Sequence, residues 1–152
     1  MLYADIAKRV SELSRARRLK VGAVIVKDDR ILSYGYNGMP KGFDNDCEDE
    51  ITKEDEYYID NGGPAHSMLT TSYVTKPEVI HAEINAIAKV AASSDSTKNS
   101  SIFITHAPCA ECAKMIIASG IETVYYLNSY RDETGINMLK LANLDVLQLE
   151  TA

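Results

Sequence analysis

The stretch VIHAEINAIAKVA, residues 79–91, places a histidine and a glutamate two residues apart at the start of a helical pattern. A second stretch, APCAECAKMII at residues 107–117, places two cysteines three residues apart, directly after a proline and again at the start of a helical pattern. Because three protein ligands leave one position of a tetrahedral Zn²⁺ open, the sequence predicts a catalytic metal site. The three zinc-type ligands and the one free carboxylate are His81, Cys109, Cys112 and Glu83.

The spacing of these residues has a physical reason. Residues three apart lie on one face of a helix, so Cys109 and Cys112 can reach the same metal ion. Pro108 suits the first helical position, where its missing N–H is not needed, and the partial positive charge of a helix N-terminus favours the metal-binding thiolate. His81 and Glu83 cannot point the same way along a regular helix, but at a first turn His81 can hold the metal while Glu83 reaches the open position.

Each motif taken alone has a plainer interpretation. A CxxC pair is often a redox pair or half of a structural zinc site, and HAE alone carries little information. A structural site needs four ligands, and the chain has only three cysteines and three histidines. The combination of the two motifs therefore favours a catalytic site. The alternative is a non-catalytic, zinc-stabilised nucleotide-binding module, which would not require a free carboxylate at Glu83.

Length and composition are those of an ordinary globular chain. The 152 residues are 45% apolar and 25% charged, which predicts a single domain over residues 1–152. No apolar run approaches the ~20 residues that span a bilayer, and the charged N-terminus is not a signal peptide, so no membrane partner is expected. Three cysteines, two of them committed to a metal, predict a reducing, cytoplasmic location.

The charge distribution bears on the choice of substrate. The net charge is −6, with acidic residues concentrated in residues 42–60 and basic residues more frequent in residues 1–41. DNA or tRNA requires a basic groove, so a nucleic-acid polymer is not expected as a partner. A small anion bound by a few local basic residues remains compatible with this composition.

Hydrophobic periodicity predicts an α/β fold of three layers, α/β/α, with a mixed five-stranded sheet and helices on both faces. The expected helices span residues 2–18, 81–93, 109–119 and 134–143. The expected strands span residues 21–26, 31–37, 101–105, 123–127 and 145–149. Residues 44–78 lack clear periodicity and are interpreted as a long insertion that covers the site, with a short helix near residues 53–59.

With these motifs and this order of elements, the chain resembles the zinc-dependent cytidine and deoxycytidylate deaminase superfamily, and its deoxycytidylate (dCMP) branch in particular. H-x-E combined with P-C-x-x-C is a known signature of zinc nucleobase deaminases. The resemblance covers most of the chain except residues 44–78 and implies a cytidine deaminase-like fold. It rests on VGAVIVKDDRI (21–31), GYNGMPKG (35–42), HAEINAI (81–87) and PCAECAKMIIASGI (108–121).

The resemblance implies hydrolytic deamination of dCMP to dUMP with release of ammonia, which supplies dUMP for thymidylate synthesis. It implies one catalytic Zn²⁺ per chain on His81, Cys109 and Cys112, with Glu83 as the proton shuttle. It also implies substrate contacts, with Asn37 at the sugar hydroxyl and Arg18 near the phosphate; the others are Ala82, Pro108, Tyr130 and Arg131. An alternative is a cytidine or deoxycytidine nucleoside deaminase, which phosphate dependence would distinguish.

The resemblance further implies regulation, because many members are homohexamers activated by dCTP and inhibited by dTTP. The candidate regulatory segment is rich in glycine, so its backbone could approach phosphates closely. The acidic residues 44–60 are candidates for holding Mg²⁺ with the triphosphate. The plainer alternative is a turn that only shapes the site wall. The candidate regulatory residues are Gly35, Tyr36, Gly38, Met39, Lys41 and Gly42.

Overall fold

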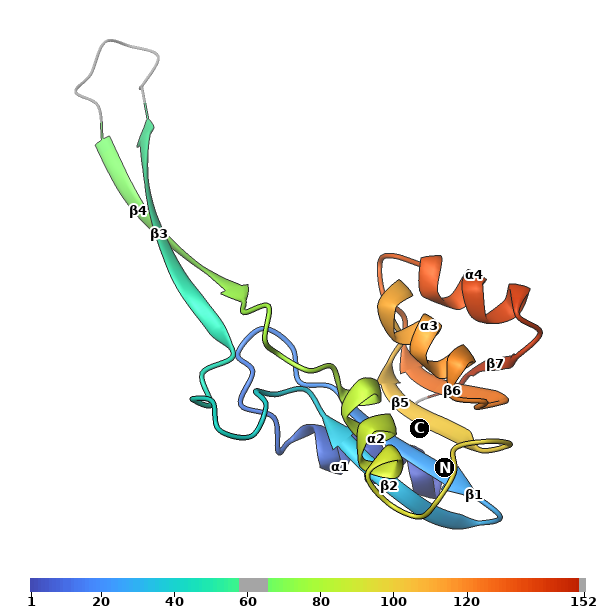
Figure 1. Ribbon diagram of the computed structural model, residues 1–152. Helices are drawn as coiled ribbons and strands as arrows, with labels where there is room; N and C mark the ends of the chain where they lie inside the picture. The colour runs from blue at the N-terminus through green and yellow to red at the C-terminus, as the bar shows by residue number, and fades with distance from the viewer. Residues whose placement is uncertain (58–65, 151–152) are drawn as a thin grey trace.

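A mixed five-stranded sheet forms the centre of the computed structural model, which describes residues 1–57 and 66–150 (Figure 1). In sheet order the strands are β2 (Arg30–Tyr36), β1 (Gly22–Lys27), β5 (Ser101–His106), β6 (Thr123–Asn128) and β7 (Asp145–Gln148). β1 runs antiparallel to both of its neighbours, whereas β5, β6 and β7 are parallel. The predicted mixed sheet of five strands is confirmed.

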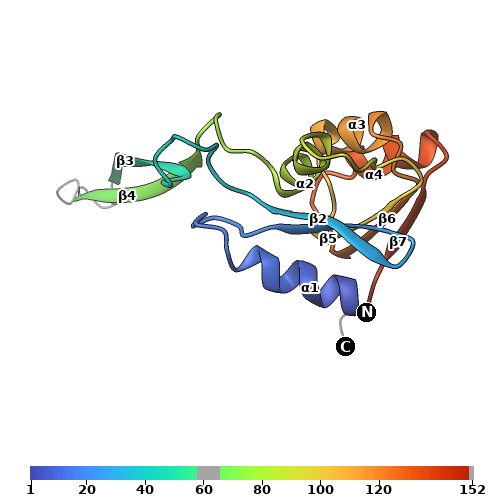
Figure 2. The ribbon, with the colours of Figure 1, turned by 60° about the horizontal axis from the view of Figure 1, so that its bottom comes forward.

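Four helices cover the two faces of this sheet (Figure 2). α1 (Leu2–Ser11) lies on one face, and α2 (Ala82–Ala91), α3 (Ala110–Ala118) and α4 (Thr134–Leu141) lie on the other. The predicted three-layer arrangement is therefore confirmed. None of the helices in the described part of the chain exceeds ten residues, so none of them could cross a lipid bilayer.

The first helix is shorter than the sequence predicts. It was expected to reach residue 18 but ends at Ser11. Beyond it, the Ser14 hydroxyl donates to the Asn37 carbonyl at 2.7 Å and accepts from the Ala16 N–H at 3.2 Å. These side-chain bonds offer the backbone an alternative to the helix and hold residues 14–16 beside the end of β2.

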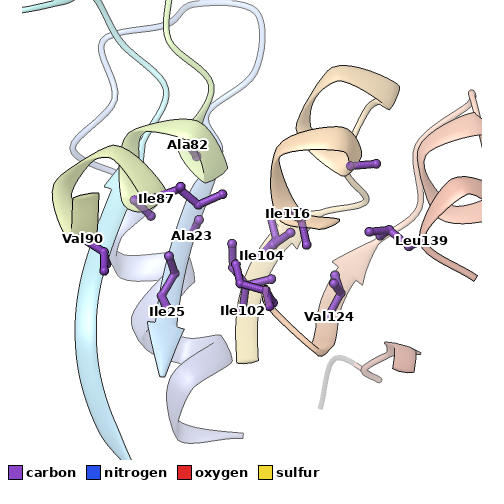
Figure 3. Close-up of a cluster of buried hydrophobic side chains, with 13 residues drawn as sticks. Ala23, Ile25, Ala82, Ile87, Val90, Ile102, Ile104, Ile116, Val124 and Leu139 are labelled. Atoms are coloured by element: carbon purple, nitrogen blue, oxygen red, sulfur yellow. The ribbon is translucent and has the colours of Figure 1, made fainter. Parts of the chain in front are cut away.

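The core lies mainly between the sheet and the three helices α2, α3 and α4 (Figure 3). β1 is buried on both faces because its side chains alternate: Ala23 and Ile25 face this main core, whereas Val24 and Val26 pack with α1. On β5, Ile102 and Ile104 belong to the same core. This packing sets the helix starts of α2 and α3 relative to the end of β5.

Residues 44–78 differ from the irregular insertion that the sequence predicts. They contain a second, two-stranded sheet, in which β3 (Glu48–Tyr57) pairs antiparallel with β4 (His66–Thr75). The helix expected near residues 53–59 is wrong over residues 53–57, which belong to β3; residues 58 and 59 lie outside the described part. The hairpin projects away from the main sheet, and only its base lies near the site described below (Figures 1 and 2).

Candidate active site

The starts of two helices bring the predicted metal ligands together. His81 is the N-cap of α2, and Cys109 is the N-cap of α3, with Cys112 one turn further on. His81 Nδ1 lies 3.3 Å from Cys112 Sγ and 3.6 Å from Cys109 Sγ. Because His81 has an extended backbone (φ −68°, ψ 154°), its side chain does not follow the helical direction of Glu83. This geometry lets both residues of HAE serve one site.

The three donors fit a zinc ion. One donor atom from each of His81, Cys109 and Cys112 lies within 4.8 Å of the other two. Zn–N and Zn–S bonds of about 2.0–2.3 Å in a tetrahedron place neighbouring ligand atoms about 3.6 Å apart, close to the 3.3 and 3.6 Å between His81 Nδ1 and the two sulfurs. No other such donor cluster occurs among the described residues, including the acidic residues 44–57. The donor set leaves one tetrahedral position for a water or substrate.

The three donor side chains shift one another's pKa values. Hydrogen bonds from Cys112 and His81 hold the pKa of the Cys109 thiol well below its usual range. The hydrogen bond with Cys109 raises the pKa of His81. The hydrogen bond with Cys109, together with burial, raises the pKa of the Cys112 thiol. A cation that binds both sulfurs would favour the thiolate form of each.

Glu83 stands beside this centre as a buried carboxyl group. It lies in the first turn of α2 and is only 4% exposed. Burial raises the pKa of its carboxyl group, because a low-dielectric environment disfavours the charged form. Glu83, His81 and Cys109 line the same cavity of about 370 Å³. The arrangement provides a metal centre and a separate proton acceptor that open into one pocket.

Most of the predicted substrate residues line this pocket. Its wall includes Asn37, Arg18, Ala82, Tyr130 and Arg131. Pro108 is the exception: it is fully buried and does not line the cavity, although its neighbours Ala107 and Cys109 do. Residues 107–109, here called the metal loop, connect β5 to α3. Pro108 therefore supports the metal loop and is not part of the pocket surface.

Both polar atoms of the Asn37 side chain are hydrogen-bonded to the backbone. Its Oδ1 accepts from the Val21 N–H and its Nδ2 donates to the Leu19 carbonyl, both at 2.8 Å. One amide hydrogen and one lone pair remain for a ligand. Asn37 thus shapes the loop from Leu19 to Val21 as well as lining the pocket.

The side chains of the basic run Arg15, Arg17 and Arg18 lie in three different surroundings. Arg18 lines the active pocket, and its guanidinium donates to Thr75 Oγ1 at 3.3 Å. The Arg17 side chain instead lies over the Tyr73 ring, 5.2 Å from its centroid, and 3.7 Å from an Asp46 carboxylate oxygen. Arg15 lines a different hollow. Arg18 is therefore the member of this run that reaches the active pocket.

The candidate regulatory residues do not all line one hollow. Tyr36, Gly38 and Met39 line a second hollow of about 260 Å³ together with Arg15. Lys41 and Gly42 do not line it. At Gly35 a Cβ would lie 2.2 Å from the Ala82 carbonyl oxygen, so this glycine permits the close packing of β2 against α2.

Sequence reasoning missed several residues of the active pocket, among them the polar residues Glu48, Thr75 and His106. His106 ends the buried strand β5, close before the metal loop, and this position was a usable signal. Burial lowers the pKa of its imidazole and favours the neutral form. Glu48 and Thr75 are opposite each other at the base of the β3–β4 hairpin, and nothing in their sequence neighbourhood predicts that pairing.

This fold and this site define a class of protein. A three-layer α/β/α domain that carries a His-Cys-Cys centre and a buried carboxylate that is not a ligand is typical of zinc-dependent deaminases. The model of the cytidine and deoxycytidylate deaminase zinc-binding region matches residues 2–128 of this chain. The chain therefore belongs to the cytidine and deoxycytidylate deaminase family.

Individual relatives agree with this assignment. The deoxycytidylate deaminase of Enterobacteria phage T4 is 34% identical over 147 residues, covering 83% of this chain and 76% of that protein. The deoxycytidylate deaminase of Homo sapiens is 36% identical over 132 residues, covering 86% of this chain and 65% of that protein. The crystal structure of dCMP deaminase from the cyanophage S-TIM5 in complex with dCMP and dUMP matches with a TM-score of 0.78 and 38% identity, covering 97% of this chain and 94% of that one.

Proposed function

We propose that this protein catalyses the hydrolytic deamination of dCMP to dUMP with release of ammonia. The observation that carries the proposal is Glu83, a buried carboxyl group outside the donor set that lines the same pocket as His81 and Cys109. A centre that only stabilised the fold would not need this group. The relatives named deoxycytidylate deaminase, and the solved deaminase with dCMP and dUMP, support the choice of substrate.

The chemistry follows from one metal and one carboxylate. A bound Zn²⁺ lowers the pKa of a coordinated water to about 7. Glu83 accepts a proton from the attacking water and passes it to ring N3 while the water oxygen bonds to C4. Glu83 then moves the second proton to the exocyclic amine, the C4–N bond breaks, and ammonia leaves a uracil carbonyl behind. The raised pKa of Glu83 suits a group that must carry a proton for part of the cycle.

The rest of the pocket suits a nucleotide. Arg18 and Arg131 provide positive charge on its wall, and Asn37 provides a free amide hydrogen near the loop of Val21. We place the 5′-phosphate at Arg18 and the sugar at Asn37, with Ala82 and Tyr130 beside the base. A nucleoside deaminase is the second candidate, and it would have no use for the two arginines.

Regulation by dCTP and dTTP is the finer part of the proposal. The second hollow adjoins the active pocket, because Cys47 lines both and the adjacent residues Asn37 and Gly38 line one each. Arg15 supplies a positive charge there for a triphosphate that carries Mg²⁺. A homohexamer would place several such hollows in one assembly.

The cytoplasm is the proposed working compartment. All three cysteines are free, which fits this location.

A substrate panel tests the proposal. Ammonia release should be measured with dCMP, deoxycytidine and CMP on protein with a determined zinc content. The proposal expects dCMP to have the highest kcat/KM, ten- to several-hundred-fold above deoxycytidine, because each charge-assisted hydrogen bond to the phosphate contributes about 1.5–3 kcal/mol. Equal kcat/KM for dCMP and deoxycytidine would favour the nucleoside deaminase, and no ammonia from any of the three would favour the binding module.

A further inference from the structure

Glu48 is a buried acidic residue that the proposed mechanism does not use. It is the first residue of β3 and is 2% exposed. One carboxylate oxygen, Oε1, accepts from the Arg17 N–H at 2.8 Å and from the Arg18 N–H at 3.2 Å. The other oxygen, Oε2, is the buried side-chain polar atom of the described residues that has no hydrogen-bond partner. A buried acceptor left in this way is costly, so it points to a missing donor.

The position of Glu48 indicates where that donor comes from. Glu48 lines the active pocket together with Arg18, Asn37 and Thr75, whereas His81, Glu83 and Cys109 line it at the metal centre. A carboxylate can only accept hydrogen bonds. A hydrogen-bond donor on the ligand that fills this pocket would satisfy Oε2.

The proposed substrate has few donors to offer. The exocyclic amine of dCMP belongs at the metal centre, where Glu83 protonates it. The 5′-phosphate dianion has acceptors only. The remaining donor is the 3′-hydroxyl of the sugar. Resting on the proposed function, we infer that Glu48 is the acceptor for the sugar 3′-hydroxyl and thereby determines specificity for nucleotides whose 3′-hydroxyl is free.

The neighbours of Glu48 allow such a contact. Thr75 is opposite Glu48 in the strand register, so the two side chains share one face of the hairpin. Among the described residues, the one side-chain hydrogen bond of Thr75 is the bond that its Oγ1 accepts from the exposed Arg18 guanidinium at 3.3 Å. If Arg18 turned to a phosphate, it would release the Thr75 hydroxyl next to Glu48 for a contact with the sugar.

The same contact excludes other ligands. A 3′-phosphate carries no donor and would bring negative charge to the Glu48 carboxylate. Internal nucleotides of DNA have such a phosphodiester at the 3′ position. The buried carboxylate thus selects the mononucleotide by its chemistry, in addition to any effect of overall charge.

The test compares dCMP with 2′,3′-dideoxycytidine 5′-monophosphate, which lacks the 3′-hydroxyl, in the zinc-loaded wild-type protein and in Glu48→Gln. The variant keeps an oxygen for the Arg17 and Arg18 N–H groups but replaces Oε2 by a donor. Wild-type kcat/KM should be about ten- to a hundredfold higher for dCMP than for the dideoxynucleotide, as expected for a hydrogen bond to a charged group. In Glu48→Gln the ratio should fall at least fivefold, with the loss confined to dCMP. Glu50→Gln, an exposed change two residues along the same strand, should keep the wild-type ratio.

The outcomes separate this inference from the proposed function. Wild-type turnover of dCMP supports the function, whatever the ratio. Equal kcat/KM for the two nucleotides in the wild type, or an unchanged ratio in Glu48→Gln, overturns the role of Glu48. If Glu48→Gln does not fold, Glu48→Asp retracts the carboxylate by one methylene and must lower the same ratio. An unchanged ratio in Glu48→Asp would show that the inference is wrong. Should the wild type not turn over dCMP at all, calorimetric binding of the two nucleotides gives the same ratio.

Discussion

Gly38 and Ile80 exchange two backbone hydrogen bonds, from the Gly38 N–H to the Ile80 carbonyl at 3.1 Å and from the Ile80 N–H to the Gly38 carbonyl at 2.9 Å. Ile80 directly precedes the metal donor His81, and Gly38 directly follows Asn37. This bridge therefore ties the loop beside the second hollow to the metal centre. A ligand bound in that hollow would be connected to the metal centre by this short pair of backbone hydrogen bonds.

The bridge leads to a prediction about kinetics. If the hollow binds a regulatory triphosphate, the rate plotted against dCMP concentration should be sigmoidal, with dCTP and Mg²⁺ relaxing the curve and dTTP accentuating it. Arg15→Gln should abolish the response to both nucleotides because Arg15 lines the hollow but not the active pocket. Hyperbolic kinetics indifferent to dCTP and dTTP would show that the chain has the hollow without the switch.

The metal centre can be tested by removing one donor. Cys112→Ala should reduce the zinc content, measured by atomic emission, from about one ion per chain to a small fraction, because three protein ligands are the minimum of a catalytic site. Cys47→Ala is the matched control, since Cys47 is also buried but lies outside the donor cluster. Stoichiometric zinc in Cys112→Ala would rule out the assigned donor set.

Arg18 should contribute to recognition of the phosphate. Arg18→Met keeps the length of the side chain but removes the guanidinium, and it should lower kcat/KM for dCMP about ten- to a hundredfold, mainly through KM. The value for deoxycytidine should change little. Arg9→Met, an exposed change on α1, serves as the control. An equal loss on the nucleotide and the nucleoside would mean that Arg18 supports the pocket and does not bind the phosphate.

Gly135 should be intolerant of substitution for a geometric reason. A Cβ at this position would lie 2.1 Å from the Pro108 carbonyl oxygen and 2.8 Å from the backbone of Cys109. Gly135→Ala must therefore displace α4 or the metal loop, at a cost of about 1–3 kcal/mol or more in the free energy of unfolding. We expect a lower Tm and weaker zinc retention than in Asn137→Ala, an exposed change in the same helix. Wild-type values of both would contradict the tight packing.

The main fold and the metal centre were predictable because their signals are local. Strands such as β1 and β5 are short apolar runs, and Cys109 and Cys112 are three apart at the start of a helix. The β3–β4 hairpin was not predictable. Apart from Glu48 at its base, those of its side chains that the structure describes are exposed, so no buried face imposes a period on the sequence.

Tertiary contacts also decided what the sequence could not show about single residues. Arg15, Arg17 and Arg18 look equivalent in the sequence, yet Glu48, some 30 positions away, binds the backbone of the last two. Gly35 appeared to be part of a phosphate-binding loop, but its position beneath α2 explains the glycine by packing. The many acidic residues between positions 44 and 56 likewise gave no sign that Glu48 is the carboxylate that lines the active pocket.

The central claim is that Glu83 moves protons at a zinc centre that deaminates dCMP. The direct measurement is kcat for conversion of dCMP to dUMP by the wild type and by Glu83→Gln, each with its zinc content determined in the same sample. We predict turnover by the wild type and equal zinc in both proteins, with kcat lowered 10²–10⁴-fold or more in the variant, as expected for the loss of a general acid and base. Wild-type protein that holds one zinc per chain but forms no dUMP, or a Glu83→Gln variant with undiminished kcat, would contradict the account.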